Sequence, residues 1–371
     1  MQIGVPKEIK VLEQRVGLTP ASVRELADHG HTVLVERGAG AGIGQSDDVY
    51  ERAGATIVGM PAEVFARADM IVKVKEPQAA ERAMLREGQV LFTYLHLAPD
   101  PEQARDLIAS GAVCIAYETV TSANGGLPLL APMSEVAGRM AVQAGAHFLE
   151  KPQGGKGLLL GGVPGVAPAR VTILGGGVVG THATEIALGM GAQVTVLDRN
   201  IDALRRLWSQ FGTRLATAFS SRHAIERHVA AADLVIGGVL VPGASAPKLV
   251  SADLIRRMEP GSVVVDVAID QGGCFATSRP TTHADPTYVV DGVVHYCVAN
   301  MPGGVPRTST YALNNVTLPF VVALAEKGWR RALTEDPHLR NGLNVAFGKV
   351  TCEPVAQALG YRYEPPQALL A

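Results

Sequence analysis

One stretch, Val171–Asp198, constrains the fold of this chain more than any other. It opens with the short apolar run Val171–Leu174, which predicts a buried strand because it is aliphatic and partly β-branched. The run Gly175–Gly180 follows at once and fits the spacing G-x-G-x-x-G. Thr181–Met190 is rich in helix formers, and the apolar run Gln193–Leu197 predicts a second strand with an aspartate directly after it. Strand, glycines, helix, strand and acid stand in the order of a dinucleotide-binding βαβ unit.

Each part of this motif has a physical role at a dinucleotide. Gly175 permits the tight turn, Gly177 leaves room for the pyrophosphate, and Gly180 lets helix and strand pack closely. The free amides and positive dipole at the helix start favour phosphate charge. Asp198 is expected to accept the ribose hydroxyls and to repel the extra phosphate of NADP, so NAD is the predicted cofactor although Arg199 follows. The alternative is a glycine-rich turn in some other α/β protein.

The whole-chain composition is that of a globular α/β protein. The 371 residues are 47% hydrophobic and 18% charged, with a formal net charge of −2, so nothing points to nucleic acid or to an anionic membrane. The charged N-terminus lacks the apolar core of a signal peptide, and apolar runs are too short to span a membrane. The cysteines are scattered without a CxxC pair, which suits a reducing cytoplasm: Cys114, Cys274, Cys297 and Cys352.

The order of the expected elements predicts two α/β domains. Residues 1–128 alternate short strands with helical patterns, which favours a mostly parallel sheet. A long helix over residues 129–150 leads into residues 171–300, where strands and helices continue. Residues 307–329 predict a helix that returns to the first domain, and the tail from about Ala332 is expected to be polar, short-helical and finally loose. The expected fold is a Rossmann-type, doubly wound nucleotide domain inserted in a second α/β domain.

Four residues attract attention on chemical grounds. The guanidinium of Arg15, in a polar loop, suits a bidentate grip on a carboxylate. Lys75 and His96 follow predicted strands, where functional side chains of parallel sheets gather; an ammonium can polarise a carbonyl, and imidazole transfers protons near neutral pH. Asp270 follows a strand of the nucleotide domain and could orient water or an amine. A solvated arginine, an exposed lysine, a structural histidine and a turn aspartate are the alternatives.

Other motifs offer no competing chemistry. No G-x-S-x-G, HExxH or Walker sequence occurs. The glycine-rich run Gly38–Gly44 does not fit G-x-G-x-x-G in any register, so it is interpreted as a flexible or structural turn, with a second nucleotide site as the alternative.

The chain resembles the bacterial L-alanine dehydrogenases over nearly its full length. Specific stretches carry the likeness, among them IGVPKEIK, RVGLTP, KVKEP, LFTYLHLA, VVVDVAIDQGGC and VANMPGGVPRTSTYAL. The resemblance implies reversible oxidative deamination of L-alanine by NAD to pyruvate and ammonium, usually in a homohexamer. It also implies a substrate domain of residues 1–128 and 307–371 and an NAD-binding domain of residues 129–306.

The resemblance also assigns residues. Arg15 and Lys75 match substrate-binding positions, and His96 and Asp270 match catalytic positions. The positions that match cofactor contacts are Ser134, Gly175, Gly177, Val178, Val179, Gly180, Asp198, Ser220, Val239, Leu240, Ile269, Asp270, Arg279, Val298, Ala299, Asn300 and Met301.

The chain departs from its apparent family at a few positions. Ala203 stands where relatives often carry a basic residue beside the adenosine, and Ala323 and Lys327 replace an acid and a histidine associated with a metal in some relatives, so no metal is expected. Three other activities stay open: the NAD-binding subunit of a transhydrogenase, a saccharopine or lysine-type dehydrogenase, and a non-catalytic NAD-binding sensor.

Overall fold

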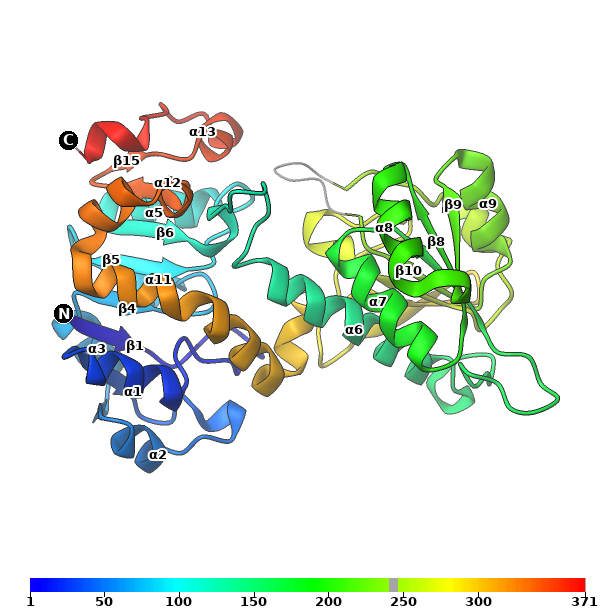
Figure 1. Cartoon of the computed structure of the whole chain (residues 1–371), viewed down its shortest axis with the longest axis horizontal. Helices are drawn as coiled ribbons and strands as arrows, with labels where there is room; N and C mark the ends of the chain where they lie inside the picture. Colours follow the sequence, from blue (N-terminus) through cyan, green and yellow to red (C-terminus); the bar gives the residue numbers. More distant parts are fainter. Residues whose placement is uncertain (240–245, 371) are drawn as a thin grey trace. The chain divides into compact units, whose positions relative to one another are not determined.

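The computed structural model describes residues 1–239 and 246–370. The chain forms two compact units: a split unit of Met1–Met133 and Val305–Ala371, and an inserted unit of Ser134–Gly304. In Figure 1 the blue-to-cyan and orange-to-red parts of the chain share one unit, and the green and yellow parts form the other. The predicted class, α/β with a Rossmann-type unit inserted in a second α/β unit, is confirmed.

The split unit is built on an eight-stranded sheet in the order β15-β14-β6-β5-β4-β1-β2-β3. In the part of the sheet that runs β6-β5-β4-β1-β2-β3, every neighbouring pair of strands is parallel. Read from the β3 side, this is the strand order 3-2-1-4-5-6 of a doubly wound sheet. From β1 the chain continues toward β3, and from the neighbouring β4 it continues toward β6. The boundary between β1 and β4 is therefore the switch point of the sheet. The strands are β1 (Gln2–Val5), β2 (Thr32–Glu36), β3 (Ala55–Val58), β4 (Met70–Val72), β5 (Val90–Thr93), β6 (Val113–Ala116), β14 (Leu343–Ala346) and β15 (Lys349–Val350).

Most helices of the split unit begin where the sequence supplies a side-chain cap or a proline. The side chain of Thr19 accepts a hydrogen bond from the Ser22 amide, and Pro20 is the first helical residue of α1, as predicted. Asp100 caps α5 in the same way. The helices are α1 (Pro20–Asp28), α2 (Asp47–Arg52), α3 (Pro61–Arg67), α4 (Ala79–Arg82), α5 (Pro101–Ser110), α11 (Pro306–Glu335), α12 (Pro337–Arg340) and α13 (Glu353–Leu359), with 3-10 turns η1 (Ala41–Ile43), η2 (Tyr117–Thr119) and η7 (Pro366–Leu369).

The expectation of a tail of short helices with a loose end is wrong for residues 343–350, which form two strands. Strands β14 and β15 form a hairpin, and β14 joins the sheet antiparallel to β6. Phe347 and Gly348 form the two-residue turn with φ of 49° and 75°, the backbone of a type I′ turn. Burial of Leu343 and Val345 explains why this segment belongs to the core and not to solvent.

The returning helix α11 extends beyond its predicted end. Its backbone leaves the helical conformation at Gly328, with φ 70° and ψ 155°, and the chain is helical again up to Glu335. A glycine adopts this conformation at little cost, so the long helix bends there.

The inserted unit repeats the same strand order. Its seven-stranded sheet has the order β12-β13-β11-β10-β7-β8-β9. Read from β9 to β13, the six parallel strands have the order 3-2-1-4-5-6, and β12 is antiparallel at the edge. The strands are β7 (Arg170–Leu174), β8 (Gln193–Asp198), β9 (Leu215–Phe219), β10 (Leu234–Gly237), β11 (Val263–Asp266), β12 (Thr287–Val290) and β13 (Val293–Tyr296). The helices are α7 (Val178–Gly189), α8 (Ile201–Phe211), α9 (Arg222–Ala230) and α10 (Ala252–Arg256), with 3-10 turns η3 (Lys151–Gln153), η4 (Gly212–Arg214), η5 (Val267–Gln271) and η6 (Met301–Gly304). Helix α6 (Ala131–Phe148) carries the chain from one unit into the other.

The central strands of both sheets are buried along their whole length. Every residue of β4, β5, β6, β10 and β11 is buried, as expected for parallel strands covered on both faces. Strand β4 stops at Val72 and β5 stops at Thr93, so Lys75 and His96 lie on loops just beyond them. These loops start at the carboxyl edge of the sheet, where ligands of doubly wound folds bind.

Candidate active site

In the split unit, the chemically promising residues follow the strands at the switch point of the sheet. Arg15 lies on the loop after β1, Lys75 on the loop after β4, and His96 on the loop after β5. Because β1, β4 and β5 are parallel neighbours, all three loops leave the same edge of the sheet. This is the position at which doubly wound sheets bind their ligands.

Arg15 is a buried cation held by an acidic partner. Its side chain is 2% exposed, and its Nε and Nη2 donate to the two carboxylate oxygens of Glu13 at 2.7 and 2.6 Å. Its Nη1 lies 3.1 Å from the sulfur of Met133. Burial works to lower the pKa of Arg15, but the hydrogen bonds and charge of Glu13 outweigh it and raise that pKa above its usual value. The guanidinium is therefore fixed both in charge and in orientation.

The loop that carries Arg15 is pressed against the sheet and braced by α11. A Cβ at Gly17 would lie 2.3 Å from the carbonyl oxygen of Val72, so only glycine allows this approach to the end of β4. Asn314 of α11 accepts a hydrogen bond from the Thr19 amide at 2.7 Å and donates to the Gly17 carbonyl at 2.9 Å. Thr310 accepts from the Val16 amide at 3.3 Å. Sequence reasoning missed these bracing residues.

Lys75 lies in a partly buried network of alternating charges. Its side chain is 12% exposed, and its Nζ lies 3.5 Å from Glu76, which also pairs with Lys10. Burial works to raise the pKa of Glu76, but the charge of Lys75 and the hydrogen bond from Lys10 outweigh it and lower that pKa. The network holds the Lys75 side chain beyond the strand end and leaves part of that side chain accessible.

His96 has an unusual backbone conformation. Its φ is 50°, a left-handed value that costs free energy in a residue other than glycine. Glu118 accepts a hydrogen bond from the His96 amide at 2.6 Å and lies 3.6 Å from Nδ1 of the ring. The ring stacks on Tyr94 with centroids 5.7 Å apart and planes 4° apart, while its side chain stays 43% exposed. Glu118 and Tyr94 hold an accessible imidazole in one place, as a proton-transfer group requires.

In the inserted unit, the glycine loop has the geometry expected of a pyrophosphate site. Gly175 has a φ of 102°, and a Cβ at Gly180 would lie 1.8 Å from the Gly175 carbonyl oxygen. A Cβ at Gly177 would meet no atom within 4 Å, so this position opens to solvent. Helix α7 begins at Val178, earlier than the predicted Thr181, and its first amides thus belong to the loop itself.

Asp198 ends β8 beside this loop. Its Oδ2 accepts from the Gly176 amide at 2.6 Å, and its Oδ1 accepts from the Asn200 amide at 2.7 Å. The carboxylate thus braces the glycine loop from the neighbouring strand end, the position from which an acid reaches a ribose in dinucleotide-binding folds.

Most other predicted cofactor residues lie beyond the carboxyl ends of the strands of the inserted unit. Ser220 follows β9, Val239 follows β10, Ile269 and Asp270 follow β11, and Val298–Met301 follows β13. The ends of these parallel strands form one edge of the sheet.

The structure gives the exposure, conformation or surroundings of four of these predicted residues. Asp270 is exposed, and Asn300 has a φ of 62°. Arg279 lies over the ring of Tyr288 at 4.1 Å, and Ser134 lies near the start of α6. Leu240 lies outside the described residues.

A buried acid that sequence reasoning missed shapes the Asp270 loop. Asp266 ends β11, and its carboxylate accepts from the Ala268 amide at 3.1 Å, the Cys274 amide at 2.9 Å and the Ser278 hydroxyl at 2.5 Å. Burial raises the pKa of Asp266 in spite of these hydrogen bonds. An acid at a strand end was the signal used for Asp198, and it could have identified Asp266 as well.

The metal-associated positions of some relatives carry other contacts here. Lys327 forms an ion pair with Glu335 at 2.8 Å. Within residues 1–239 and 246–370, no group of three or more His, Cys, Asp or Glu side chains is arranged to hold a metal ion.

No helix in the described part of the chain is both long enough and apolar enough to cross a membrane.

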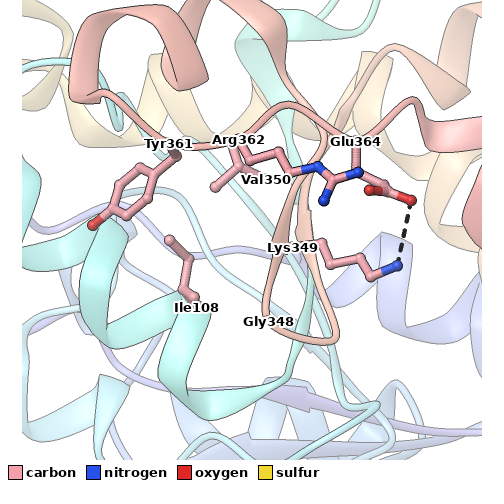
Figure 2. A pocket seen from close by; sticks show the side chains of 7 residues that line it. All are labelled: Ile108, Gly348, Lys349, Val350, Tyr361, Arg362 and Glu364. Carbon is pink, nitrogen blue, oxygen red and sulfur yellow. Dashed lines mark hydrogen bonds and ion pairs between the residues drawn. The ribbon is translucent and has the colours of Figure 1, made fainter.

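A separate cavity of about 460 Å³ lies near the C-terminus of the split unit (Figure 2). Its charged lining includes Lys349 and Glu364, which pair with each other at 3.4 Å. The cavity contains none of the predicted site residues, so its size alone does not make it the active site. The residues beyond the strand ends, Arg15, Lys75 and His96, form the candidate active site instead.

Comparisons with known proteins identify the family of the chain. Residues 4–137 match the family model described as "Alanine dehydrogenase/PNT, N-terminal domain", and residues 141–353 match "Alanine dehydrogenase/PNT, C-terminal domain". The alanine dehydrogenase of Halomonas elongata is 61% identical over 370 residues, covering 100% of both chains.

Solved structures point to the same family. A structure named L-alanine dehydrogenase is 54% identical with a TM-score of 0.94, covering 97% of this chain and 99% of its own. A transhydrogenase from Sinorhizobium meliloti is 25% identical with a TM-score of 0.80, covering 94% of this chain and 98% of its own.

Proposed function

The chain belongs to the alanine dehydrogenase/PNT family, and from that premise we propose that it is an NAD-dependent L-alanine dehydrogenase. The reaction is L-alanine, NAD⁺ and water to pyruvate, ammonium, NADH and a proton, and it is reversible. The main support for the proposal is the position of Arg15, Lys75 and His96. They lie on three loops that leave the same edge of one sheet. Two cations and an imidazole fit a small 2-amino or 2-oxo acid.

The carboxylate of the substrate is assigned to the two cations. Arg15, which Glu13 holds in a fixed plane, grips one carboxylate, as guanidinium groups do. Lys75 binds the same carboxylate or polarises the carbonyl oxygen of pyruvate. Because both side chains are largely buried, water competes weakly with the substrate for them.

The remaining steps belong to acid–base chemistry. NAD⁺, which the glycine loop and Asp198 would hold in the inserted unit, would supply the acceptor for a hydride from the α-carbon of alanine and so leave the substrate as an imine. Asp270 orients the attacking water, and His96 moves protons as the carbinolamine forms and collapses to pyruvate.

An assay of the purified protein tests this function. NADH formation from L-alanine, and NADH consumption with pyruvate plus ammonium, are expected, with little turnover of lysine or saccharopine. Turnover of lysine or saccharopine in preference to alanine would favour that dehydrogenase class, and NAD binding without turnover would favour a sensor. Hydride exchange between two nucleotides without alanine would favour the transhydrogenase subunit.

The glycine loop and Asp198 support NAD over NADP. The open space at Gly177 suits a pyrophosphate, and the Asp198 carboxylate would repel a 2′-phosphate. Changing Asp198 to glycine is expected to raise the ratio of kcat/KM for NADP to kcat/KM for NAD by about tenfold or more. Removing roughly 1.4 kcal/mol of repulsion toward NADP corresponds to a tenfold change in this ratio.

Asp202→Asn is the matched control for Asp198. It removes one negative charge from the first turn of α8, near Asp198 in sequence, and is expected to leave the ratio unchanged. An unchanged ratio in Asp198→Gly itself would show that another group selects the cofactor.

A homohexamer in the cytoplasm belongs to the same proposal. Exposed apolar side chains on the short hairpin around Val163 and Val166 support self-association, since they are 53% and 59% exposed in the single chain. Sedimentation velocity measures the assembly, and a monomer would contradict it. Four free cysteines suit a reducing compartment.

A further inference from the structure

Three buried charges of the split unit form ion pairs next to the backbone of Lys75. The ammonium of Lys73, directly after β4, lies 2.9 Å from Glu8 and 2.7 Å from Glu81. The three side chains are 0%, 1% and 2% exposed. Charges so far from water are expensive unless each has partners, so their arrangement is tightly constrained.

The second oxygen of Glu8 binds the backbone that carries Lys75. Oε1 of Glu8 accepts a hydrogen bond from the Val74 amide at 2.7 Å and one from the Lys75 amide at 3.2 Å. Glu8 lies just after β1, whereas Val74 and Lys75 lie just after β4, so this one carboxylate joins the two loops at the switch point. The other oxygen of Glu8 is held by Lys73.

We propose that Glu8 is a positioning residue, which fixes the backbone of Lys75 and thereby the ammonium that binds the substrate carboxylate. The inference rests on the proposed function, because it needs Lys75 to contact substrate. Glu8 itself contacts the backbone of Lys75 and not the reacting atoms. Lys73 orients Glu8 by occupying the oxygen that faces away from the two amides.

Only a carboxylate satisfies both sides of this position. Glu8 needs an acceptor toward the Lys73 ammonium and another toward the two amides. A carboxamide has one acceptor and one donor group, so a glutamine must turn its NH₂ toward either the ammonium or the amides. The charge-assisted bond to Lys73 is the stronger of the two, so in Glu8→Gln the carboxamide oxygen stays with the ammonium and the Lys75 backbone loses its anchor.

Glu81 provides a matched control. It faces the same ammonium through Oε1, and its Oε2 accepts from the Gln78 amide at 2.8 Å instead of from the Lys75 backbone. Glu8→Gln and Glu81→Gln thus remove the same charge from the same lysine, and similar losses in Tm are expected. Only Glu8→Gln disturbs the backbone of Lys75.

The first test is the steady-state kinetics of both variants with pyruvate, ammonium and NADH. Glu8→Gln is expected to raise KM for pyruvate by about tenfold, the size of one weakened charge-assisted contact, with kcat little changed. Glu81→Gln is expected to leave that KM within about threefold of wild type, and NADH affinity is expected to stay the same in both. Equal KM values in the two variants would overturn the inference, because a loss of charge beside Lys73 would then explain the result.

A second pair of variants keeps the test valid if Glu8→Gln fails to fold. Lys73→Met/Glu8→Gln and Lys73→Met/Glu8→Leu both lack the buried ammonium and differ in whether residue 8 can accept the two amides. Burial already raises the pKa of Glu81, so this acid can take up a proton once Lys73 is gone. KM for pyruvate is expected to be about tenfold higher in the leucine variant, and equal values would overturn the inference.

Two reference measurements separate failure of the inference from failure of the proposed function. Wild-type protein without alanine or pyruvate turnover, or a Lys75→Ala variant with unchanged KM, would contradict the role given to Lys75. Normal turnover that depends on Lys75 but not on Glu8 would contradict the positioning role alone.

Discussion

Replacing His96 with alanine is expected to lower kcat for alanine oxidation by about 100- to 10,000-fold, the usual contribution of positioned acid–base catalysis. His96 is the imidazole that follows β5, and its side chain is 43% exposed while Glu118 and Tyr94 fix its place. A group that only transfers protons contributes little to binding, so the affinity for NADH is expected to change little.

A second variant is needed because the backbone of His96 is in the left-handed conformation. With φ of 50°, an alanine at position 96 would be strained, whereas asparagine tolerates left-handed backbone well. His96→Asn therefore removes the imidazole while it keeps the local conformation. A loss of kcat of the same size in both variants would assign the effect to the missing imidazole and not to the loop.

His29 serves as the control histidine for this experiment. It is 37% exposed and, like His96, lies next to a glutamate, in this case Glu326 at 2.6 Å. His29→Ala is expected to keep normal turnover because His29 lies at the end of α1 and not at the carboxyl edge of the sheet. Near-normal turnover in His96→Asn would remove His96 from the mechanism.

The inserted unit could be predicted from local sequence because its constraints are local. Gly175 must adopt a positive φ, and Gly180 must lack a side chain next to the carbonyl oxygen of Gly175, so both requirements fall within six residues. The hairpin of β14 and β15 was not predicted because its turn, Phe347–Gly348, lacks the usual sequence signal. A type I′ turn is usually identified by an asparagine or aspartate before the glycine. Its pairing with β6 is also distant in sequence.

The candidate site was only half predictable for the same reason. Lys75 and His96 could be identified from strand ends, Arg15 from its polar loop, and all three from a family resemblance. Their supports could not, because Asn314 acts on the Arg15 loop from α11 and Glu8 acts on the Lys75 backbone from the loop after β1. Such contacts join residues far apart in the chain, and a single sequence contains no pattern that pairs them.

Replacing Arg15 with lysine is expected to lower kcat/KM for L-alanine and for pyruvate by about 100-fold or more. Each hydrogen bond to a charged group contributes roughly 1.5 to 3 kcal/mol, and about 1.4 kcal/mol is tenfold, so the loss of a bidentate grip accounts for an effect of this size. A lysine keeps a positive charge beside the buried Glu13, which limits the loss of stability. Steady-state kinetics in both directions measure the effect.

Arg82 provides the control that separates substrate binding from structure. It is also largely buried in the split unit, where it pairs with Asp106 at 2.8 Å and Glu102 at 3.1 Å, but it lies on α4. Arg82→Lys is expected to lower Tm and to leave KM near its wild-type value. If Arg15→Lys raises KM no more than Arg82→Lys does, then Arg15 is an ion-pair partner of Glu13 and the carboxylate of the substrate is bound elsewhere. A large rise in KM for Arg15→Lys alone, with NADH affinity retained, would assign that carboxylate to the guanidinium.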